Sequence, residues 1–120
     1  MGLDLFYMGL QGTIARDIGN LSFLTYLDLS NNSFIGLIPN EIGNLICLRT
    51  LNMSYNELSG HIPNSVGLLR NLQRLDLSAN HAIGSMLGAY STFSPYREFL
   101  YVEINFQERF PLTFANIYQN

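Results

Sequence analysis

The 120-residue sequence contains no lysine and no tryptophan, and its six basic residues are all arginine. Without lysine, the chain has neither the phosphate-binding lysine of a P-loop nor the strand lysine of protein kinases, and it cannot form a Schiff base. Charged residues make up only 12% of the sequence, the net charge is -3, and no run of basic residues occurs. The charge pattern therefore indicates neither a nucleic-acid partner nor an anionic membrane surface.

Cysteine is almost absent, since Cys47 is the only one. A single cysteine excludes an internal disulfide and a cysteine-rich zinc site. Its position between Ile46 and Leu48 predicts a small, buried hydrophobic side chain. No run of roughly 18 apolar residues is present and the first residues lack a cationic n-region, so neither a transmembrane segment nor a signal peptide is visible. We expect any such segment to lie outside these residues.

What the sequence does contain is a repeat of 24 residues. Leucines keep this interval at the positions equivalent to Leu27 and Leu29, and glycines keep it in two sets. The glycine sets are Gly12, Gly36, Gly60 and Gly84, and Gly19, Gly43 and Gly67. The shared motif reads LxxLxLSxNxLxGxIPxxIGNL. A period of this length predicts a solenoid whose stacked coils bury one continuous core.

The alternation around Leu27 and Leu29 predicts a short strand in each coil, because period two sends the apolar side chains inward. Equal phase in successive coils predicts parallel, in-register strands about 4.8 Å apart. The asparagines that follow the strands are interpreted as a structural ladder, whose side-chain amides bond free backbone groups from coil to coil. This ladder comprises Asn32, Asn56 and Asn80.

The segments LTYLDLSNNSFIGLIPNEIGN and LRTLNMSYNELSGHIPNSVG resemble the plant-specific class of leucine-rich repeats. These repeats form the ectodomains of leucine-rich-repeat receptor-like kinases and receptor-like proteins. The resemblance implies an α/β fold, a right-handed solenoid of about four to five coils with a concave parallel β-sheet. It also implies a second short sheet near each LxGxIP stretch and mostly short helical turns on the convex side, around each IGNL stretch.

The same resemblance implies a non-catalytic recognition function. Such ectodomains bind peptides, microbial or hormonal ligands and partner receptors, so a peptide or protein ligand and a co-receptor are expected here, without a cofactor. Full-length relatives are membrane-anchored, which implies a location at the cell surface or outside the cell. Two alternatives remain open: a secreted inhibitor of a cell-wall enzyme, similar to polygalacturonase-inhibiting proteins, and a truncated product without independent function.

The repeats are clear over residues 1–87, whereas residues 88–120 form a tail that holds nine of the fifteen aromatic residues. Met8 replaces the ladder asparagine in the first coil, and Ala15 and Leu87 replace prolines. These departures, together with the missing capping region, predict a fragment, a truncated product or a degenerate copy of a longer solenoid.

The tail keeps the 24-residue frame faintly, with Tyr101 at the phase of Leu77 and residues 110–117 at the phase of IPNEIGNL. A strand is therefore expected near residues 99–106, as a fifth strand of the sheet. Two phases are open, because a one-residue slip exchanges the buried and exposed sets. Either Phe99 and Tyr101 point inward, or Leu100, Val102, Ile104 and Phe106 do.

The outward positions of the predicted strands form the candidate partner-binding surface. It consists of Tyr26, Asp28, Thr50, Asn52, Arg74 and Asp76. An acid or amide at the phase of Asp28 belongs to the repeat motif, so a structural role competes there. Tyr26 and Arg74 are the stronger candidates, because tyrosine and arginine are enriched at binding hot spots. Tyr7 and Tyr55 share the next exposed phase and are weaker candidates.

No residue set points to catalysis or to a metal. His61 and His81 lie at exposed phases without a cysteine or carboxylate at ligand spacing. The serines that follow the strands share their face with no histidine, and no GxSxG elbow occurs. The chain is therefore predicted to be no enzyme, with no catalytic residue and no metal site.

Three N-x-Ser sequons predict N-glycosylation if the chain enters the secretory pathway. The acceptors would be Asn20, Asn31 and Asn52. A glycan on Asn52 would stand on the concave face and block the binding surface, so Asn20 is the favoured acceptor.

Overall fold

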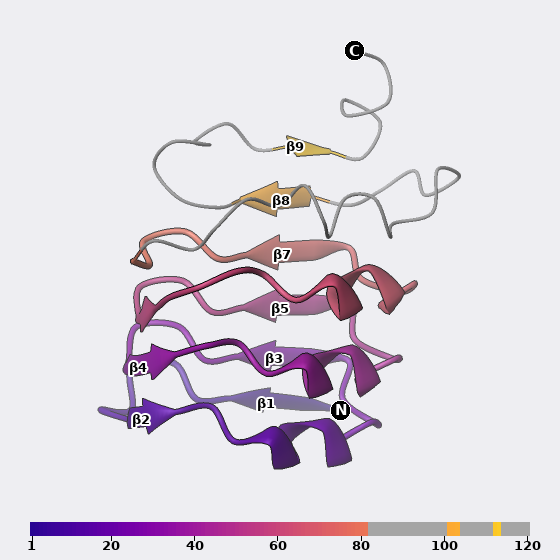
Figure 1. Cartoon of the computed structure of the whole chain (residues 1–120). Helices are drawn as coiled ribbons and strands as arrows, with labels where there is room; N and C mark the ends of the chain where they lie inside the picture. The colour runs from indigo at the N-terminus through magenta and orange to yellow at the C-terminus, as the bar shows by residue number, and fades with distance from the viewer. Residues whose placement is uncertain (82–100, 104–111, 114–120) are drawn as a thin grey trace.

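The computed structural model describes residues 1–81, 101–103 and 112–113, and this part of the chain winds into a stack of similar coils (Figure 1). Each of the first three coils runs from a strand of one sheet to a strand of a second sheet and then to a 3-10 helix. The elements are β1 (Gly2–Asp4), β2 (Gln11–Thr13), η1 (Arg16–Asn20), β3 (Tyr26–Asp28), β4 (Ser33–Gly36), η2 (Asn40–Asn44), β5 (Thr50–Asn52), β6 (Glu57–Leu58), η3 (Asn64–Leu68), β7 (Arg74–Asp76), β8 (Tyr101–Glu103) and β9 (Leu112–Thr113).

The larger sheet has the strand order β1-β3-β5-β7-β8-β9, and its first five strands are parallel. Leu27 is paired with Leu3 on one side and with Leu51 on the other, and Leu51 with Leu75. Each of these pairs spans one 24-residue repeat, so the predicted in-register parallel sheet is confirmed. Identical residues at identical phase make this register the one that turns every inner leucine toward the core.

The smaller sheet has the order β2-β4-β6 and lies in front of the larger one in Figure 1, together with the 3-10 helices. Pro39 and Pro63 immediately precede η2 and η3, where their φ values of -70° and -61° match the proline ring. Ala15 takes the same conformation before η1, so the missing proline does not alter the first coil. None of the helices in the described part is long and apolar enough to cross a membrane.

Glycine is required at two positions of the coil, once for its backbone conformation and once for lack of space. Gly36, the last residue of β4, has a φ of +79°, a backbone conformation that residues with a side chain disfavour. At Gly43, a Cβ atom would lie 2.6 Å from Cβ of Ser65 and 2.8 Å from its carbonyl oxygen. Successive helices η2 and η3 therefore approach too closely for any side chain at this phase.

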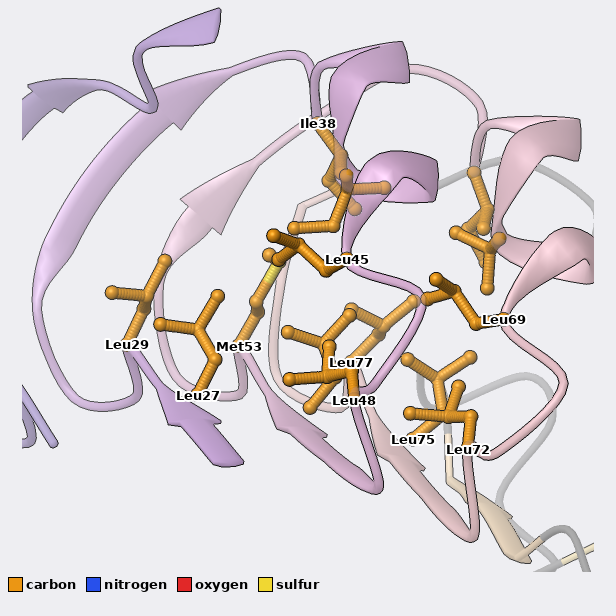
Figure 2. Close-up of a cluster of buried hydrophobic side chains, with 14 of the residues drawn as sticks. Leu27, Leu29, Ile38, Leu45, Leu48, Met53, Leu69, Leu72, Leu75 and Leu77 are labelled. Atoms are coloured by element: carbon orange, nitrogen blue, oxygen red, sulfur yellow. The ribbon is translucent and has the colours of Figure 1, made fainter. Parts of the chain in front are cut away.

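The core is a continuous column of apolar side chains enclosed between the two sheets and the helices (Figure 2). Its inner positions repeat from coil to coil, so that Leu48 and Leu72 occupy equivalent places behind the strands. At the first coil, Leu3 and Leu5 are only partly buried, because this coil has a described neighbour on one side alone. The core therefore arises from stacking and not within any one coil.

The tail contributes the predicted fifth parallel strand, β8, but not in the 24-residue frame. Val102 is paired with Leu75, which lies 27 residues earlier, and its side chain is 1% exposed. The phase with Val102 inward is thus confirmed. Val102 fills the buried site beside Leu75 with a branched apolar side chain, and this burial fixes the register between β7 and β8. The other residues of the two predicted sets lie outside the described residues or have side chains that are not described.

The extension of the repeat frame over residues 110–117 is also wrong where the structure describes it. Leu112–Thr113 forms β9, which pairs antiparallel with β8 at the end of the larger sheet. The repeat frame aligns these two residues with Asn40 and Glu41, which begin η2 and not a strand. The rest of that segment lies outside the described residues.

Cys47 was expected to be buried, and the structure shows that it is a free, exposed thiol. Its neighbour Ile46 is also exposed, whereas Leu45 and Leu48 point into the core. After η2 the chain forms a turn at Ile46 and Cys47, and both of these side chains point outward. The error came from judging burial by apolar neighbours in sequence.

We expect Leu51→Ala to lower the free energy of unfolding by about 2 to 5 kcal/mol, because the cavity would interrupt the column between Leu27 and Leu75. Urea denaturation followed by circular dichroism measures the change. Leu37→Ala is the matched control, since Leu37 is exposed, and it should change the free energy by less than about 0.5 kcal/mol. Similar losses in both variants would contradict the assignment of the core.

Candidate functional site

The concave face, the side of the larger sheet that turns away from the core, carries two columns of residues. The strand register places Tyr26 beside Thr50 and Thr50 beside Arg74. The second column runs through Asp4, Asp28, Asn52 and Asp76. The sheet therefore brings all six residues of the predicted binding surface onto three neighbouring strands, β3, β5 and β7.

Tyr26 and Arg74 are the exposed members of this surface. The Tyr26 ring is 38% exposed, and its hydroxyl donates a hydrogen bond to Oδ2 of Asp28 at 3.2 Å. Arg74 is exposed two strands away, with Thr50 half-buried between them. The face thus presents an aromatic ring and a guanidinium separated by one small side chain, an arrangement suited to contact with a partner.

The exposure expected for Asp28 and Asp76 is corrected by the structure, since they are only 7% and 8% exposed. Each carboxylate accepts hydrogen bonds from the backbone N–H and the hydroxyl of the serine two residues later, Ser30 or Ser78. These bonds hold the carboxylates against the strand ends. Asp28 and Asp76 therefore shape the turn, and their surface is largely unavailable to a partner.

Asn52 makes the same local bonds, because its Oδ1 accepts from the backbone N–H and hydroxyl of Ser54. It is half-buried, unlike the two aspartates. The Asp or Asn of the repeat motif thus has one geometric role in successive coils, and Asn52 supplies it without a charge. This substitution removes one negative charge from the middle of an otherwise acidic column.

The ladder asparagines occupy the space behind the turn and link each coil to the one before it. The side-chain Nδ2 of Asn56 donates to the carbonyl oxygens of Leu29, Met53 and Ser54, and its Oδ1 accepts from the N–H of Phe34. Asn32 and Asn80 make the equivalent bonds one coil away on either side. The amide matches three acceptors and a donor that a strand end leaves without sheet partners.

Burial raises the pKa of the Tyr26 phenol above its ordinary value of 10.0. The negative charge of Asp28 acts in the same direction, as do its hydrogen bond with the phenol and the charge of Asp4, whereas Arg74 acts in the opposite direction. The phenol is charged only when deprotonated, so the folded state favours the neutral form. Any stability gained is present below the ordinary pKa and lost as the pH rises through the raised one.

The three predicted glycan acceptors differ in accessibility. Asn20 is exposed at the end of η1, whereas Asn31 and Asn52 are half-buried. Asn52 is further engaged through its side-chain oxygen with Ser54. Glycosylation at any of them stays a prediction, and the exposure of Asn20 supports its place as the favoured acceptor.

One surface feature was not assigned by the sequence. A groove of about 930 Å³ lies between the smaller sheet and the 3-10 helices, lined by Leu37, Pro39, Gly60, His61 and Pro63 among others. The groove runs past the Ile-Pro pairs of successive coils, so it forms only when the chain winds into coils. Among the described residues, no group of three or more His, Cys, Asp or Glu side chains is placed to hold a metal ion.

Comparison with protein families shows that a profile described as "Leucine-rich repeat region" matches residues 3–93. The chain belongs to the leucine-rich repeat family. The match covers the coils whose sheet, helices and ladder are described above. A comparison with curated protein sequences found no match.

Solved structures of plant leucine-rich repeat proteins are similar to this chain. The BIR2 ectodomain from Arabidopsis thaliana is 32% identical, with a TM-score of 0.70, over 87% of this chain and 55% of that one. A plant ice-binding protein is 29% identical, with a TM-score of 0.73, over 86% of this chain and 34% of that one. The Arabidopsis receptor kinase HAESA, in complex with the peptide hormone IDA and the co-receptor SERK1, is 25% identical, with a TM-score of 0.62, over 86% and 20%.

The leucine-rich repeat chain spans about half the length of the BIR2 ectodomain and a smaller share of the other two. These likenesses confirm the resemblance to plant receptor ectodomains and the solenoid fold that it implied. The stacked parallel strands and short helices of the described coils agree with that fold.

We expect Asn56→Ala to destabilise the chain by about 1 to 3 kcal/mol or more, because the buried N–H of Phe34 and three carbonyl groups lose their partner. Thermal and urea denaturation measure the loss. Asn40→Ala is the control, since Asn40 is exposed at the start of η2. Equal stability of Asn56→Ala and the unmodified chain would contradict a structural role for the ladder.

Asp28→Asn is expected to lower the pKa of Tyr26, because the neighbouring negative charge is removed. Tyrosinate absorbance during alkaline titration measures the pKa, as the difference between each protein and its counterpart that also carries Tyr26→Phe. Asp17→Asn, on the exposed surface of η1, is the charge-matched control and should leave the Tyr26 titration unchanged. An unchanged titration in Asp28→Asn would count against the coupling of the two side chains.

Proposed function

We propose that this leucine-rich repeat chain is a non-catalytic recognition module that binds a peptide or protein ligand on its concave face. The observation that carries the proposal is the pair formed by Tyr26 and Arg74, which stand exposed on β3 and β7 across the half-buried Thr50. Binding would rest on contact area, hydrogen bonds and charge.

The similar structures support this class of ligand. HAESA is seen with a peptide hormone and a co-receptor, RGFR1 is a peptide hormone receptor in complex with RGF2, and BIR3 forms a complex with SERK2. By analogy, this chain would bind a peptide and would meet a co-receptor at the cell surface or outside the cell, in signal or pathogen perception.

Tyr26 would supply apolar contact area and one hydroxyl, while Arg74 would pair with a carboxylate of the ligand. Thr50 and Asn52, both half-buried, lie between these anchors and would offer shorter-range hydrogen bonds. Asp28 and Asp76 would act indirectly, by holding the turns and orienting the Tyr26 hydroxyl. The alternative function, a secreted inhibitor of a cell-wall enzyme, would use the same face. Its ligand would be a carboxylate-bearing surface of that enzyme in place of a peptide.

The test begins with a displayed random-peptide library selected on the full chain. We expect selected peptides to carry acidic or C-terminal carboxylate groups and to bind in the micromolar range or tighter. Tyr26→Ala and Arg74→Ala should each weaken the binding of a selected peptide at least tenfold, which corresponds to about 1.4 kcal/mol. Isothermal titration calorimetry measures the affinities.

Arg70→Ala is the matched control, because Arg70 is exposed outside the strands of the concave face. It should leave peptide affinity within about twofold of the unmodified chain. Selected peptides whose affinity survives both Tyr26→Ala and Arg74→Ala, while the variants keep their circular dichroism spectra, would refute the concave face as the binding site.

A further inference from the structure

A second surface lies where the chain leaves the larger sheet. One residue per coil there has the left-handed backbone conformation, and these four residues form the turn column: Tyr7, Asn31, Tyr55 and Ala79, with φ between 53° and 56°. Asparagine tolerates this conformation, whereas a bulky ring in it is uncommon. Two of the four positions nevertheless carry tyrosine, so something other than local backbone preference accounts for the rings.

The rings of the turn column are among the most exposed aromatic side chains of the described residues. Tyr7 is 77% exposed and Tyr55 is 61% exposed. Phe6, 51% exposed, stands beside Tyr7 with its ring centroid 6.0 Å away and the planes inclined at 37°. Neither tyrosine hydroxyl has a hydrogen-bond partner within the described part of the chain. The rings thus offer open faces and free hydroxyls to a ligand.

The backbone holds the turn column at a fixed spacing. The N–H of Tyr7 bonds to the carbonyl of Ser30 one coil on, that of Asn31 to Ser54, and that of Tyr55 to Ser78, at 3.0 to 3.1 Å. Equivalent bonds in successive coils set equivalent backbone positions, so Tyr7 and Tyr55 stand two coils apart, about 9.6 Å at the ordinary strand spacing. Asn31 lies midway, and its side-chain amide has no hydrogen-bond partner among the described residues.

We propose that the turn column binds a neutral, extended β-1,4-linked oligosaccharide that runs along the solenoid axis. In such a chain every second sugar ring presents the same face, at nearly the separation of the two tyrosines. The C–H faces of two such rings would stack on Tyr7 and Tyr55, with Phe6 widening the first platform. The intermediate sugar would meet the amide of Asn31, which both donates and accepts hydrogen bonds.

The charge pattern restricts the ligand to a neutral sugar. The four side chains of the turn column are uncharged, and the charged residues within three positions of them, Asp4, Asp28, Glu57 and Asp76, are all acids, of which Asp4 and Glu57 are exposed. A chain of uronic acids would place like charges beside them and would be disfavoured. This site uses none of the six residues of the candidate partner-binding surface, and it assigns Tyr7 and Tyr55, the weaker candidates for partner contact, to a sugar ligand instead. It can therefore be tested independently of the concave face.

The test uses the full chain made in a bacterial host, in which Asn31 carries no glycan, and titrates it calorimetrically with cellohexaose. Tyr7→Asn and Tyr55→Asn remove one ring each and introduce a residue that suits the left-handed backbone. We expect each to weaken binding by roughly two- to tenfold, the range for a single ring contact, and the double variant to abolish measurable heat. Tyr55→Phe, which keeps the stacking face, should retain most of the affinity.

Controls separate the site from general stickiness. Phe23→Ala removes another exposed ring, 51% exposed and outside the turn column, and should leave cellohexaose binding unchanged. Maltohexaose, whose linkage coils the chain, and an oligogalacturonide, which is acidic, should bind at least tenfold more weakly. Absence of heat with millimolar cellohexaose, or binding that survives the double variant, would overturn the proposal. Tyr26→Ala should not alter sugar binding, so failure of one site is distinguishable from failure of the other.

Discussion

No coil of this chain has enough apolar surface to form a core by itself, so its inner leucines are buried only when the next coil stacks upon them. This requirement fixes the rest of the structure. The strands must be parallel and in register, since any slip would expose one row of leucines while burying polar groups. Position 43 must be glycine, because a Cβ atom there would lie less than 3 Å from atoms of the next helix.

Stacking also creates a polar problem, because each turn leaves carbonyl and N–H groups inside the solenoid, out of reach of water. The ladder asparagines solve it with one amide per coil, which donates to acceptors of its own coil and of the preceding one. The first coil has Met8 at this phase, and its N–H still bonds to Oδ1 of Asn32. Each asparagine therefore bonds to backbone groups of the preceding coil, so the loss of one asparagine chiefly affects the coil on its N-terminal side.

The regular interior leaves the outer positions free to vary, and the two proposed sites lie at such positions. On the concave face, the outward positions carry the ring of Tyr26 and the guanidinium of Arg74. The motif acids beside them, Asp28 and Asp76, are hydrogen-bonded to serines of their own turns. At the edge of the same sheet, the turn column repeats a strained backbone angle in every coil and places tyrosines at alternate ones. Both sites inherit their spacing from the strands, which explains how short, separate segments form an ordered surface.

The sequence by itself determined the repeat length, the inward leucines and the parallel sheet, because these follow from the periodicity of residues 1–87. The second sheet and the helical turns were implied by the resemblance to plant leucine-rich repeats. It also located the columns on which Tyr26 and Arg74 stand. Only the tertiary structure decided which motif residues are accessible. Asp28 and Asp76 are covered through bonds to nearby serines, and Cys47 is turned outward by the end of η2. It likewise placed Val102 beside Leu75, outside the 24-residue frame. Periodicity gives each residue a direction, but burial and register depend on what the neighbouring coil places against it.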